Sequence, residues 1–494
     1  MAETQDGRRR HRKPHAIFIP YPLQGHVIPS VHLAVKLASH GFTVTFVNTH
    51  YIHHKISTAT GSGADVFSKL RESSPGGESL DIRYATVSDG LPLGFDRSLN
   101  HDQFMASLLH VFSAHVEELV AGIVASGGED EEVSCLIADT FFVWPAKVAK
   151  KFGLVCVSFW TEPALVYTLY HHVHLLRQNG HFGCQDRRED AIEYIPGVAS
   201  IEPKDTTSYL QEANETSVCH QIIFTAFQDA RGADFVVANT VQELEAETIS
   251  ALQAQMSYYA IGPIFPPAGF TNKSAVRTSL WSESDCSHWL DTRKPGSVLY
   301  VSFGSYAHVE KPDLVEIARG LALSGVSFVW VLRDDIVSSD DPNPLPVGFR
   351  EEVSDRSMIV GWCSQKEVLA HRAIGGFLTH CGWNSILEAA WCGVPLLCFP
   401  LYTDQFTNRK LVVDDWKVGI NLIDCKAARK EDVARNIGRL MGGDLGDELR
   451  KRVKEVKKTL ASALESNGSS ARNFGQFVEE LKNKIQTTGE RRSE

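Results

Sequence analysis

The sequence predicts an α/β protein in two halves, each built around a parallel β-sheet with helices on both faces. Short apolar runs of strand length alternate with longer stretches of helical apolar spacing along most of the 494 residues, which is typical of βαβ units. A segment dense in proline and glycine, residues 258–270, separates two such series. The length suits two or three domains at about 150 residues each.

The first half opens with a strand, a turn, a helix and a second strand, predicted at residues 15–20, 21–26, 28–40 and 42–48. Gly41 ends the helix. In this arrangement His26 lies in the first β-to-α loop, at the carboxyl end of the first strand. Ligands bind at that edge of an open α/β sheet, so His26 is a candidate for chemistry.

The alternation continues to the end of the first half. Further strands are predicted at residues 82–87, 134–138, 154–159 and 235–238, and helices at 101–125, 144–152, 161–176 and 216–230. Residues 56–80, rich in serine and glycine, are predicted to be a loop, and residues 179–212 to be irregular. Asp139 directly follows the strand at 134–138, so its carboxylate is expected at the same sheet edge as His26.

The second half repeats the pattern without a detectable sequence repeat. Strands are predicted at residues 298–303, 328–332, 358–360, 375–379 and 394–399, and helices at 313–323, 386–392, 406–416, 430–441, 448–465 and 471–485. These elements divide the chain into a disordered tail at 1–14, a first domain at 15–257, a linker at 258–272, a second domain at 273–465 and a C-terminal segment at 466–494.

Composition excludes several classes of protein. The net charge is −11 with a pI near 6.0, and no long basic stripe accompanies it, so nucleic acid is not an expected partner. The polar N-terminus lacks the apolar core of a secretory signal, and no stretch approaches the roughly 20 apolar residues of a membrane span. The 10 cysteines are scattered without C-x-x-C spacing, which indicates reduced thiols. We therefore expect a cytoplasmic monomer that does not insert into membranes.

The stretch from residue 362 to residue 405 concentrates residues that bear chemistry. A strand leads into a polar turn and then a helix, with Asn384 and Ser385 expected at the helix N-cap. The free N–H groups and the helix dipole favour an anion there, and Gly382 permits close approach of the backbone. Glu388 shares the helix face of Asn384, where its carboxylate can accept both hydroxyls of a ribose, and Trp362 offers a flat face to a base. Each feature alone is more often structural, but together they predict a nucleotide diphosphate site.

This whole stretch resembles the signature box of the plant UDP-dependent glycosyltransferases of family 1, the secondary-product enzymes. The resemblance implies a GT-B fold, in which two Rossmann-like domains face each other across a cleft and the last helix crosses back to the first domain. It also implies a function for each matching residue. Trp362 stacks on uracil, and Cys363 and Gln365 lie around the base and ribose. Glu388 holds the ribose hydroxyls, and the diphosphate is held by His380, Asn384 and Ser385. The sugar is contacted by Trp383, Asp404 and Gln405.

Within this resemblance a closing glutamine, here Gln405, indicates glucose as the transferred sugar. Two departures from the family pattern occur. Ser364 stands where proline is usual, and the sequence at 389–392 (AAWC) is atypical because Trp391 adds bulk to the helix. Neither removes an expected ligand.

Transfer of a sugar to a hydroxyl group also needs a base. Histidine, with an unperturbed pKa of about 6.5, suits proton transfer near neutrality, and a carboxylate can fix its tautomer. The related enzymes have a histidine in an early P-x-x-G-H loop and an aspartate at a later strand end, matched here by His26 and Asp139. We expect His26 to be the general base, Asp139 to orient it, and the reaction to be an inverting single displacement.

The leaving diphosphate can be stabilised by a helix N-terminus, backbone N–H groups and His380, so we expect neither a metal nor a cofactor besides the UDP-sugar donor. Of the two serines in the β-to-α turn at 302–305, Ser305 is the better candidate for diphosphate contact. The histidine pairs at 53–54 and 171–172 lack a third ligand at suitable spacing for a metal.

Loops of the first domain are expected to bind a small acceptor such as a phenol, flavonoid or terpenoid. Candidate wall residues are aromatic or apolar in character: Tyr21, Leu23, Gly90, Leu91, Phe141, Phe142, Trp160 and Tyr402. A UDP-sugar-binding sensor without activity is the main alternative, and it would lack the His26–Asp139 pair. A nicotinamide-dependent oxidoreductase is excluded, because the first loop contains only Gly25 where G-x-G-x-x-G is needed.

Overall fold

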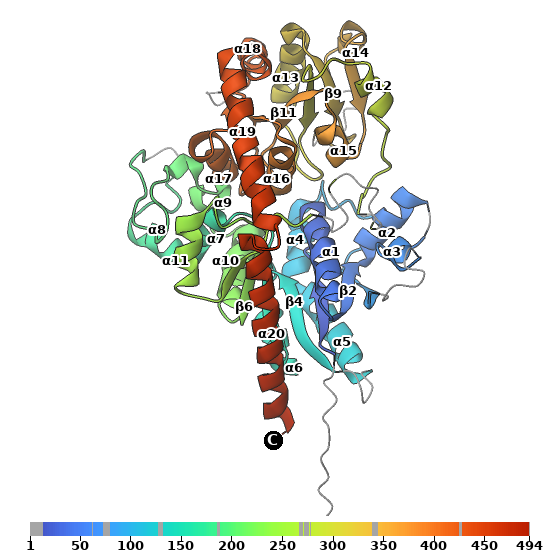
Figure 1. The fold of residues 1–494 in the computed structure, drawn as a ribbon, viewed down its shortest axis with the longest axis vertical. Helices are drawn as coiled ribbons and strands as arrows, with labels where there is room; N and C mark the ends of the chain where they lie inside the picture. Colours follow the sequence, from blue (N-terminus) through green and yellow to red (C-terminus); the bar gives the residue numbers. More distant parts are fainter. Residues whose placement is uncertain are drawn as a thin grey trace, which may run out of the picture.

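The chain folds into two α/β lobes, one above the other (Figure 1). This computed structural model describes residues 13–61, 63–72, 80–126, 132–184, 188–265, 270, 276, 278–337, 344–423 and 427–493. The tail predicted at 1–14 therefore lies almost wholly outside the described residues, as does part of the linker predicted at 258–272.

The lower lobe holds a seven-stranded parallel sheet in the order β3-β2-β1-β4-β5-β6-β7. Most of its strands are buried along their whole length, which explains their near-continuous apolar sequences. The strand order reverses between β1 and β4, which makes their carboxyl ends the edge for ligand binding. The strands are β1 His15–Ile19, β2 Thr43–Thr49, β3 Ile82–Val87, β4 Val133–Asp139, β5 Val155–Trp160, β6 Phe235–Ala238 and β7 Tyr258–Ala260.

Helices connect these strands and cover the sheet. They are α1 Gln24–Ser39, α2 His50–Thr60, α3 Ser68–Glu72, α4 His101–His110, α5 Phe112–Ala125, α6 Pro145–Phe152, α7 Ala164–His171, α8 Val173–Gln178, α9 Ser208–Gln211, α10 Val218–Ala230 and α11 Ala246–Gln253. A 3-10 turn, η1, spans Pro203–Asp205.

The upper lobe holds a six-stranded parallel sheet in the order β10-β9-β8-β11-β12-β13. Its strands are β8 Val298–Ser302, β9 Ser327–Val331, β10 Ser357–Val360, β11 Ile374–Thr379, β12 Leu396–Cys398 and β13 Gly419–Asn421. Its helices are α12 Ser287–Asp291, α13 Lys311–Ser324, α14 Phe349–Glu352, α15 Gln365–Ala370, α16 Trp383–Cys392, α17 Gln405–Lys410, the π-helical turn η2 Leu411–Asp415, α18 Lys430–Met441 and α19 Gly443–Leu464. The strand order reverses between β8 and β11, directly before the turn that leads into α16.

Several sequence predictions are wrong in detail. Residues 56–80 are not all loop, because α2 extends to Thr60 and α3 follows; the Thr49 hydroxyl caps α2 by accepting the Ile52 N–H at 3.2 Å. The segment at 258–260, assigned to the linker, is strand β7 of the first sheet. The long helix predicted at 101–125 breaks at Val111, and α4 and α5 meet at 45°.

The last helix, α20 (Ser469–Ser493), runs from the upper lobe down along the lower one (Figure 1). Phe474 and Phe477 are buried in the core of the first sheet together with Phe42. Asn473 donates to the Ala260 carbonyl at 2.8 Å, so the helix also supports the short edge strand β7. Burial of these two aromatic side chains holds the end of the chain against the first sheet.

Trp391, the unusual residue of α16, lies outside the turn that is predicted to bind the diphosphate. Its ring contacts Phe265 at a centroid distance of 5.1 Å and Phe270 at 6.3 Å. The added bulk therefore packs against the segment that joins the two lobes.

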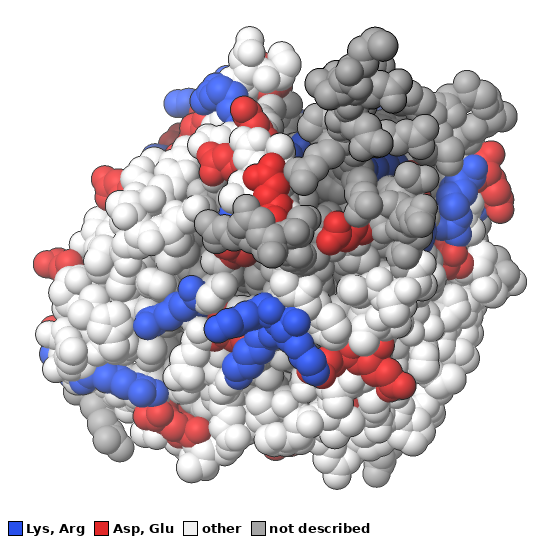
Figure 2. Space-filling view, turned by 90° about the horizontal axis from the view of Figure 1, so that it is seen from below, with Lys and Arg blue, Asp and Glu red and all other residues white. Residues whose placement is uncertain are grey.

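The described helices include no single helix with the length and hydropathy of a membrane span; α4 and α5 meet both criteria only as a bent pair. On the face in Figure 2, Lys and Arg side chains lie among Asp and Glu side chains.

Candidate active site

Two cavities lie between the lobes, where the carboxyl edges of the two sheets meet. The first, of about 220 Å³, is bordered by aromatic and apolar side chains of the lower lobe and by the loop that carries Asp404. The second, of about 200 Å³, surrounds the N-terminus of α16 and includes Trp362 and Glu388. The two cavities share a wall made of six residues: Gly25, Ser305, His380, Gly382, Trp383 and Asn384.

His26 and Asp139 form a hydrogen-bonded pair at the first cavity. His26 Nδ1 lies 2.7 Å from Asp139 Oδ2, and the aspartate side chain is only 1% exposed. Because a carboxylate only accepts, the network assigns the proton to Nδ1 and leaves Nε2 able to take another. Asp139 Oδ1 accepts the Phe141 N–H at 3.0 Å, which fixes the carboxylate. The Thr161 hydroxyl, which sequence reasoning missed, lies 2.9 Å from the same His26 nitrogen.

His26 does not lie in a loop, as predicted, but in the first turn of α1, which begins at Gln24. Pro29 in this helix has no N–H to donate to the Gly25 carbonyl, four residues back. That carbonyl instead accepts the Asn384 side-chain amide of the upper lobe at 2.6 Å. The Gly25 carbonyl, which has no helical partner, thus accepts a hydrogen bond that links the two lobes.

We expect Pro29→Ala to weaken this contact, because the new N–H competes for the Gly25 carbonyl. Loss of one hydrogen bond, about 0.5–1.5 kcal/mol, predicts a 2- to 12-fold lower kcat/KM. Initial rates would be measured for Pro29→Ala alone and in the Asn384→Ala background. Because Asn384→Ala already removes the contact, Pro29→Ala should cause no further loss of kcat/KM in that background. Pro145→Ala, at the start of α6, is the matched control; equal losses in both proline variants would contradict the mechanism.

The N-cap of α16 is Gly382, not Asn384 or Ser385 as predicted, and it makes no side-chain capping bond. Cys381, before it, has a φ of 67°. The Asn384 side chain bonds the lower lobe, where it also accepts from Asn239 at 3.3 Å, and Ser385 Oγ accepts the Gln365 amide at 3.1 Å. Among the described residues, no side chain caps the N–H groups of the first turn, and they can bind an anion.

His380 is held between two glycines. A Cβ atom on Gly304 would lie 2.5 Å from His380 Nε2, and one on Gly382 would lie 2.6 Å from the same atom. Burial and the positive charge of Arg333 lower the pKa of His380 to about 4. The imidazole is therefore neutral near pH 7 and can donate one N–H.

Arg333 holds the loop that carries Gly304 and Ser305. The buried guanidinium donates to the Gly304 carbonyl and to the Ala307 carbonyl, the latter at 2.9 Å, and pairs with Asp335 at 2.7 Å. Sequence reasoning missed this residue. Its only signal was an arginine immediately beyond a predicted strand end.

Gln365 and Glu388 lie together at the second cavity. The Gln365 amide donates to Glu388 Oε2 at 2.8 Å, and burial raises the pKa of Glu388. The Trp362 ring lies 4.5 Å from the Trp281 ring, centroid to centroid, with 30° between their planes. Trp281 was not predicted, because nothing in its sequence context pairs it with Trp362.

Ser364, the departure from the family's usual proline, has a φ of −69°, which proline also adopts. The preceding Cys363 pairs with Ser284 as an extended β-bridge, which is compatible with a following proline. We therefore expect Ser364→Pro to raise the free energy of unfolding by about 0.4–1 kcal/mol by restricting the unfolded chain. Denaturant unfolding would measure the change, and a loss of stability would show that proline does not fit here.

Asp404 and Gln405 begin α17 at the far side of the first cavity. Asp404 accepts from the Thr403 hydroxyl at 2.6 Å and from the Asn408 amide at 2.5 Å, and burial raises its pKa. Gln405 Oε1 accepts the backbone N–H of Leu401 at 2.9 Å, which leaves the NH₂ group of that side chain as a donor. Both side chains are thus fixed before any ligand binds.

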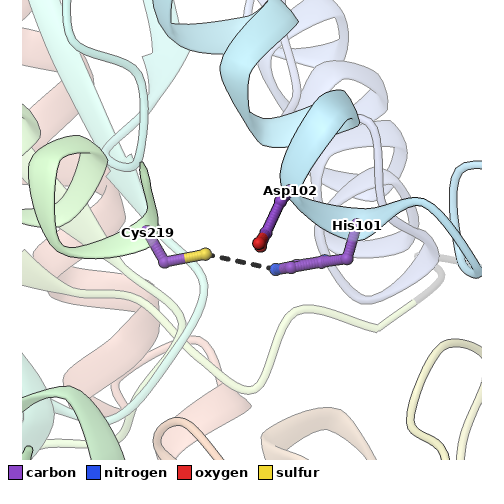
Figure 3. Close-up of side chains that lie close together, drawn as sticks. All are labelled: His101, Asp102 and Cys219. Carbon is purple, nitrogen blue, oxygen red and sulfur yellow. Dashed lines mark hydrogen bonds between the residues drawn. The ribbon is translucent and has the colours of Figure 1, made fainter. Parts of the chain in front are cut away.

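His101, Asp102 and Cys219 place three possible metal-ligand atoms within 4.8 Å of one another (Figure 3). Hydrogen bonds account for two of the three residues, His101 and Cys219. His101 Nδ1 lies 2.7 Å from the Tyr306 hydroxyl of the upper lobe, and Nε2 lies 3.2 Å from Cys219 Sγ. Burial raises the pKa of Cys219 to about 11, so the neutral thiol can donate to Nε2. This network links the lobes beside the first cavity.

The chain is similar to known proteins along almost its whole length. Residues 203–449 match the family described as UDP-glucoronosyl and UDP-glucosyl transferase. The chain is 60% identical to UDP-glycosyltransferase 86A2 of Arabidopsis thaliana, with 98% of each chain covered. The chain belongs to this family. It is also 32% identical to linamarin synthase 1 of Manihot esculenta, over 95% of this chain and 97% of that relative.

Solved structures of family members share the fold. Os79 from O. sativa, in complex with UDP, matches with a TM-score of 0.78 at 26% identity, covering 94% of this chain and 100% of that one. Phytolacca americana UGT2, complexed with UDP-2fluoro-glucose and pterostilbene, matches with a TM-score of 0.75 at 26% identity, covering 95% and 99%. The predictions of a GT-B fold and of a plant family 1 UDP-glycosyltransferase are confirmed.

Within this UDP-glycosyltransferase, the predicted site residues gather around the two cavities. All of them line one or both, except Asp139, which bonds His26 from behind. Of the predicted acceptor wall, Tyr21, Leu23, Phe141 and Tyr402 line the first cavity. The prediction is wrong for Phe142 and Trp160, which are buried in the core, and for Gly90 and Leu91, which lie away from the lining.

Proposed function

We propose that this UDP-glycosyltransferase transfers glucose from UDP-glucose to a hydroxyl group of a small lipophilic acceptor, with inversion at the anomeric carbon. The shared wall of the two cavities is the observation that carries the proposal. A nucleotide bound in the second cavity would direct its sugar past His380 and Asn384 into the first, where His26 lies.

The donor would occupy the second cavity. Trp362 would stack on uracil, Cys363 and Gln365 would lie around the base and ribose, and Glu388 would accept the ribose hydroxyls. The uncapped N–H groups of α16 would bind the diphosphate with four side chains: Ser305, His380, Asn384 and Ser385. Trp383, Asp404 and the Gln405 NH₂ group would contact the glucose.

In the reaction, the acceptor oxygen attacks the anomeric carbon from the face opposite the diphosphate. His26 Nε2 takes the acceptor proton, the bond from the anomeric carbon to the diphosphate oxygen breaks, and UDP leaves with the electron pair. Asp139 stabilises the imidazolium that forms. The α16 N-terminus and the His380 N–H stabilise the charge that develops on UDP, because both border the second cavity, where the diphosphate would lie.

The test uses the purified full chain with UDP-glucose or UDP-galactose and a mixed panel of phenols, flavonoids and terpenoids, with products identified by mass spectrometry. We expect addition of one hexose, with UDP-glucose favoured by about 10-fold or more. Equal use of both donors would reject the assignment of glucose. No transfer to two independent panels, despite UDP-glucose binding, would reject the acceptor class.

A further inference from the structure

Glu162 lines the first cavity, and its carboxyl group has no role in the proposed reaction. It follows β5, next to Thr161, whose hydroxyl lies 2.9 Å from His26 Nδ1, and it lines the cavity together with His26. Its Oε2 atom is buried and has no hydrogen-bond partner among the described residues. A buried polar atom left unpaired is costly, so a group that pairs with it on binding gains affinity.

The surroundings of Glu162 are acidic. Asp404 and Asp139 lie near it, and no lysine or arginine is among the described residues that line this cavity. Burial, followed by these two negative charges, raises the pKa of Glu162 well above its ordinary value. Burial thus favours the neutral form of the side chain, a carboxylic acid with one O–H donor and one carbonyl acceptor.

This chemistry fits one kind of ligand group best. A hydroxyl both donates and accepts, so it can satisfy both oxygens of a neutral carboxyl group. An ammonium group only donates. A carboxylate would enter a cavity that Glu162 and Asp404 line, with Asp139 close behind, and that has no Lys or Arg among its described lining residues to neutralise it.

We propose that Glu162 selects the acceptor: its carboxyl group hydrogen-bonds a second hydroxyl of an acceptor whose reacting hydroxyl lies at His26. The enzyme then prefers neutral diols to mono-alcohols or monophenols of the same shape, and it excludes acceptors that carry a carboxylate. The inference rests on the proposed function, which places the acceptor in this cavity. The lipophilic body of the diol packs on the aromatic and apolar wall, including Tyr21 and Phe141.

The test uses one ring system, so that only the second substituent varies. 2-Naphthol is compared with dihydroxynaphthalenes that carry the second hydroxyl at each available position, with hydroxynaphthoates and with aminomethyl-naphthols. We expect at least one diol to show a kcat/KM about 10-fold or more above that of 2-naphthol, mainly through KM, and the carboxylates to be rejected. Glu162→Ala should abolish the preference, so that the ratio of kcat/KM for the diol to kcat/KM for 2-naphthol falls to about one. Glu162→Gln, whose amide donates and accepts, should retain most of the preference.

Glu247→Ala, at an exposed glutamate of α11, is the matched control and should behave like the wild type. Absence of a diol preference in the wild type, or its persistence in Glu162→Ala, overturns the inference. Strong preference for the amine, lost in Glu162→Gln, would also overturn it by showing that Glu162 acts as an anion.

A binding experiment separates this inference from the proposed function. Acceptor affinity is measured by calorimetry in the presence of UDP, where no transfer can occur. A diol preference that Glu162→Ala abolishes, without any transfer from UDP-glucose, would reject the proposed reaction and leave the role of Glu162 standing. Transfer from UDP-glucose without a diol preference in binding would reject the role of Glu162 and leave the proposed reaction standing.

Discussion

His26→Ala is expected to lower kcat by about 10²- to 10⁴-fold, because it removes the general base of the proposed reaction. UDP binding should stay within about two-fold of the wild type, since His26 lines the first cavity and not the second. Asp139→Asn should lower kcat comparably without removing any base. Its amide can donate to His26 Nδ1 and shift the ring proton to Nε2, where the base must be free.

Initial rates at saturating UDP-glucose and fluorescence titration with UDP measure both expectations. His110→Ala, at an exposed histidine of α4, is the matched control and should retain full activity. Wild-type turnover in His26→Ala would mean that the base lies elsewhere. An additive loss in the double variant His26→Ala/Asp139→Asn would show that the two residues do not act as one unit.

Gly304→Ala is expected to lower kcat/KM for UDP-glucose by about 10²-fold or more, because the new methyl group overlaps the His380 ring. The Cβ atom would lie 2.5 Å from His380 Nε2, and the residue has a φ of 76°. The ring cannot move away toward Gly382, whose backbone lies against it as well. Displacement of His380 would remove a donor aimed at the diphosphate.

Gly325→Ala separates this clash from backbone strain. Gly325 also has a positive φ, 66°, but a Cβ there meets no atom within 4 Å. Both variants should lose stability through strain, by about 1–2 kcal/mol, whereas only Gly304→Ala should lose activity at temperatures where both are folded. Equal activity in the two folded variants would show that the position of His380 is not critical.

The strands and the ligand-bearing turn could be predicted because their sequences respond to local rules. Strands β1 and β11, for example, are buried along their whole length and therefore read as short apolar runs bounded by polar residues. Asp139 could be placed near His26 because parallel strands bring their carboxyl ends to one edge. The family signature then supplied the predicted tasks of the individual residues.

The residues that were missed act through tertiary contacts. Trp281 meets Trp362 from a segment about 80 residues away, and Arg333 reaches back to Gly304 across the sheet edge. Trp160 was placed on the acceptor wall, but its ring points into the core, where its indole donates to the Pro163 carbonyl at 2.8 Å. Aromatic character alone does not decide whether a side chain faces a cavity or the core behind it.

The stereochemistry of the product tests the central claim most directly. In the proposed reaction the acceptor and the leaving diphosphate lie on opposite sides of the anomeric carbon and one base acts, so a single displacement must invert the configuration. NMR of the product from UDP-glucose, in which glucose is α-linked, should show a β-glucoside through its large coupling constant between H1 and H2. An α-glucoside would mean retention, and it would contradict both the single displacement and the role of His26.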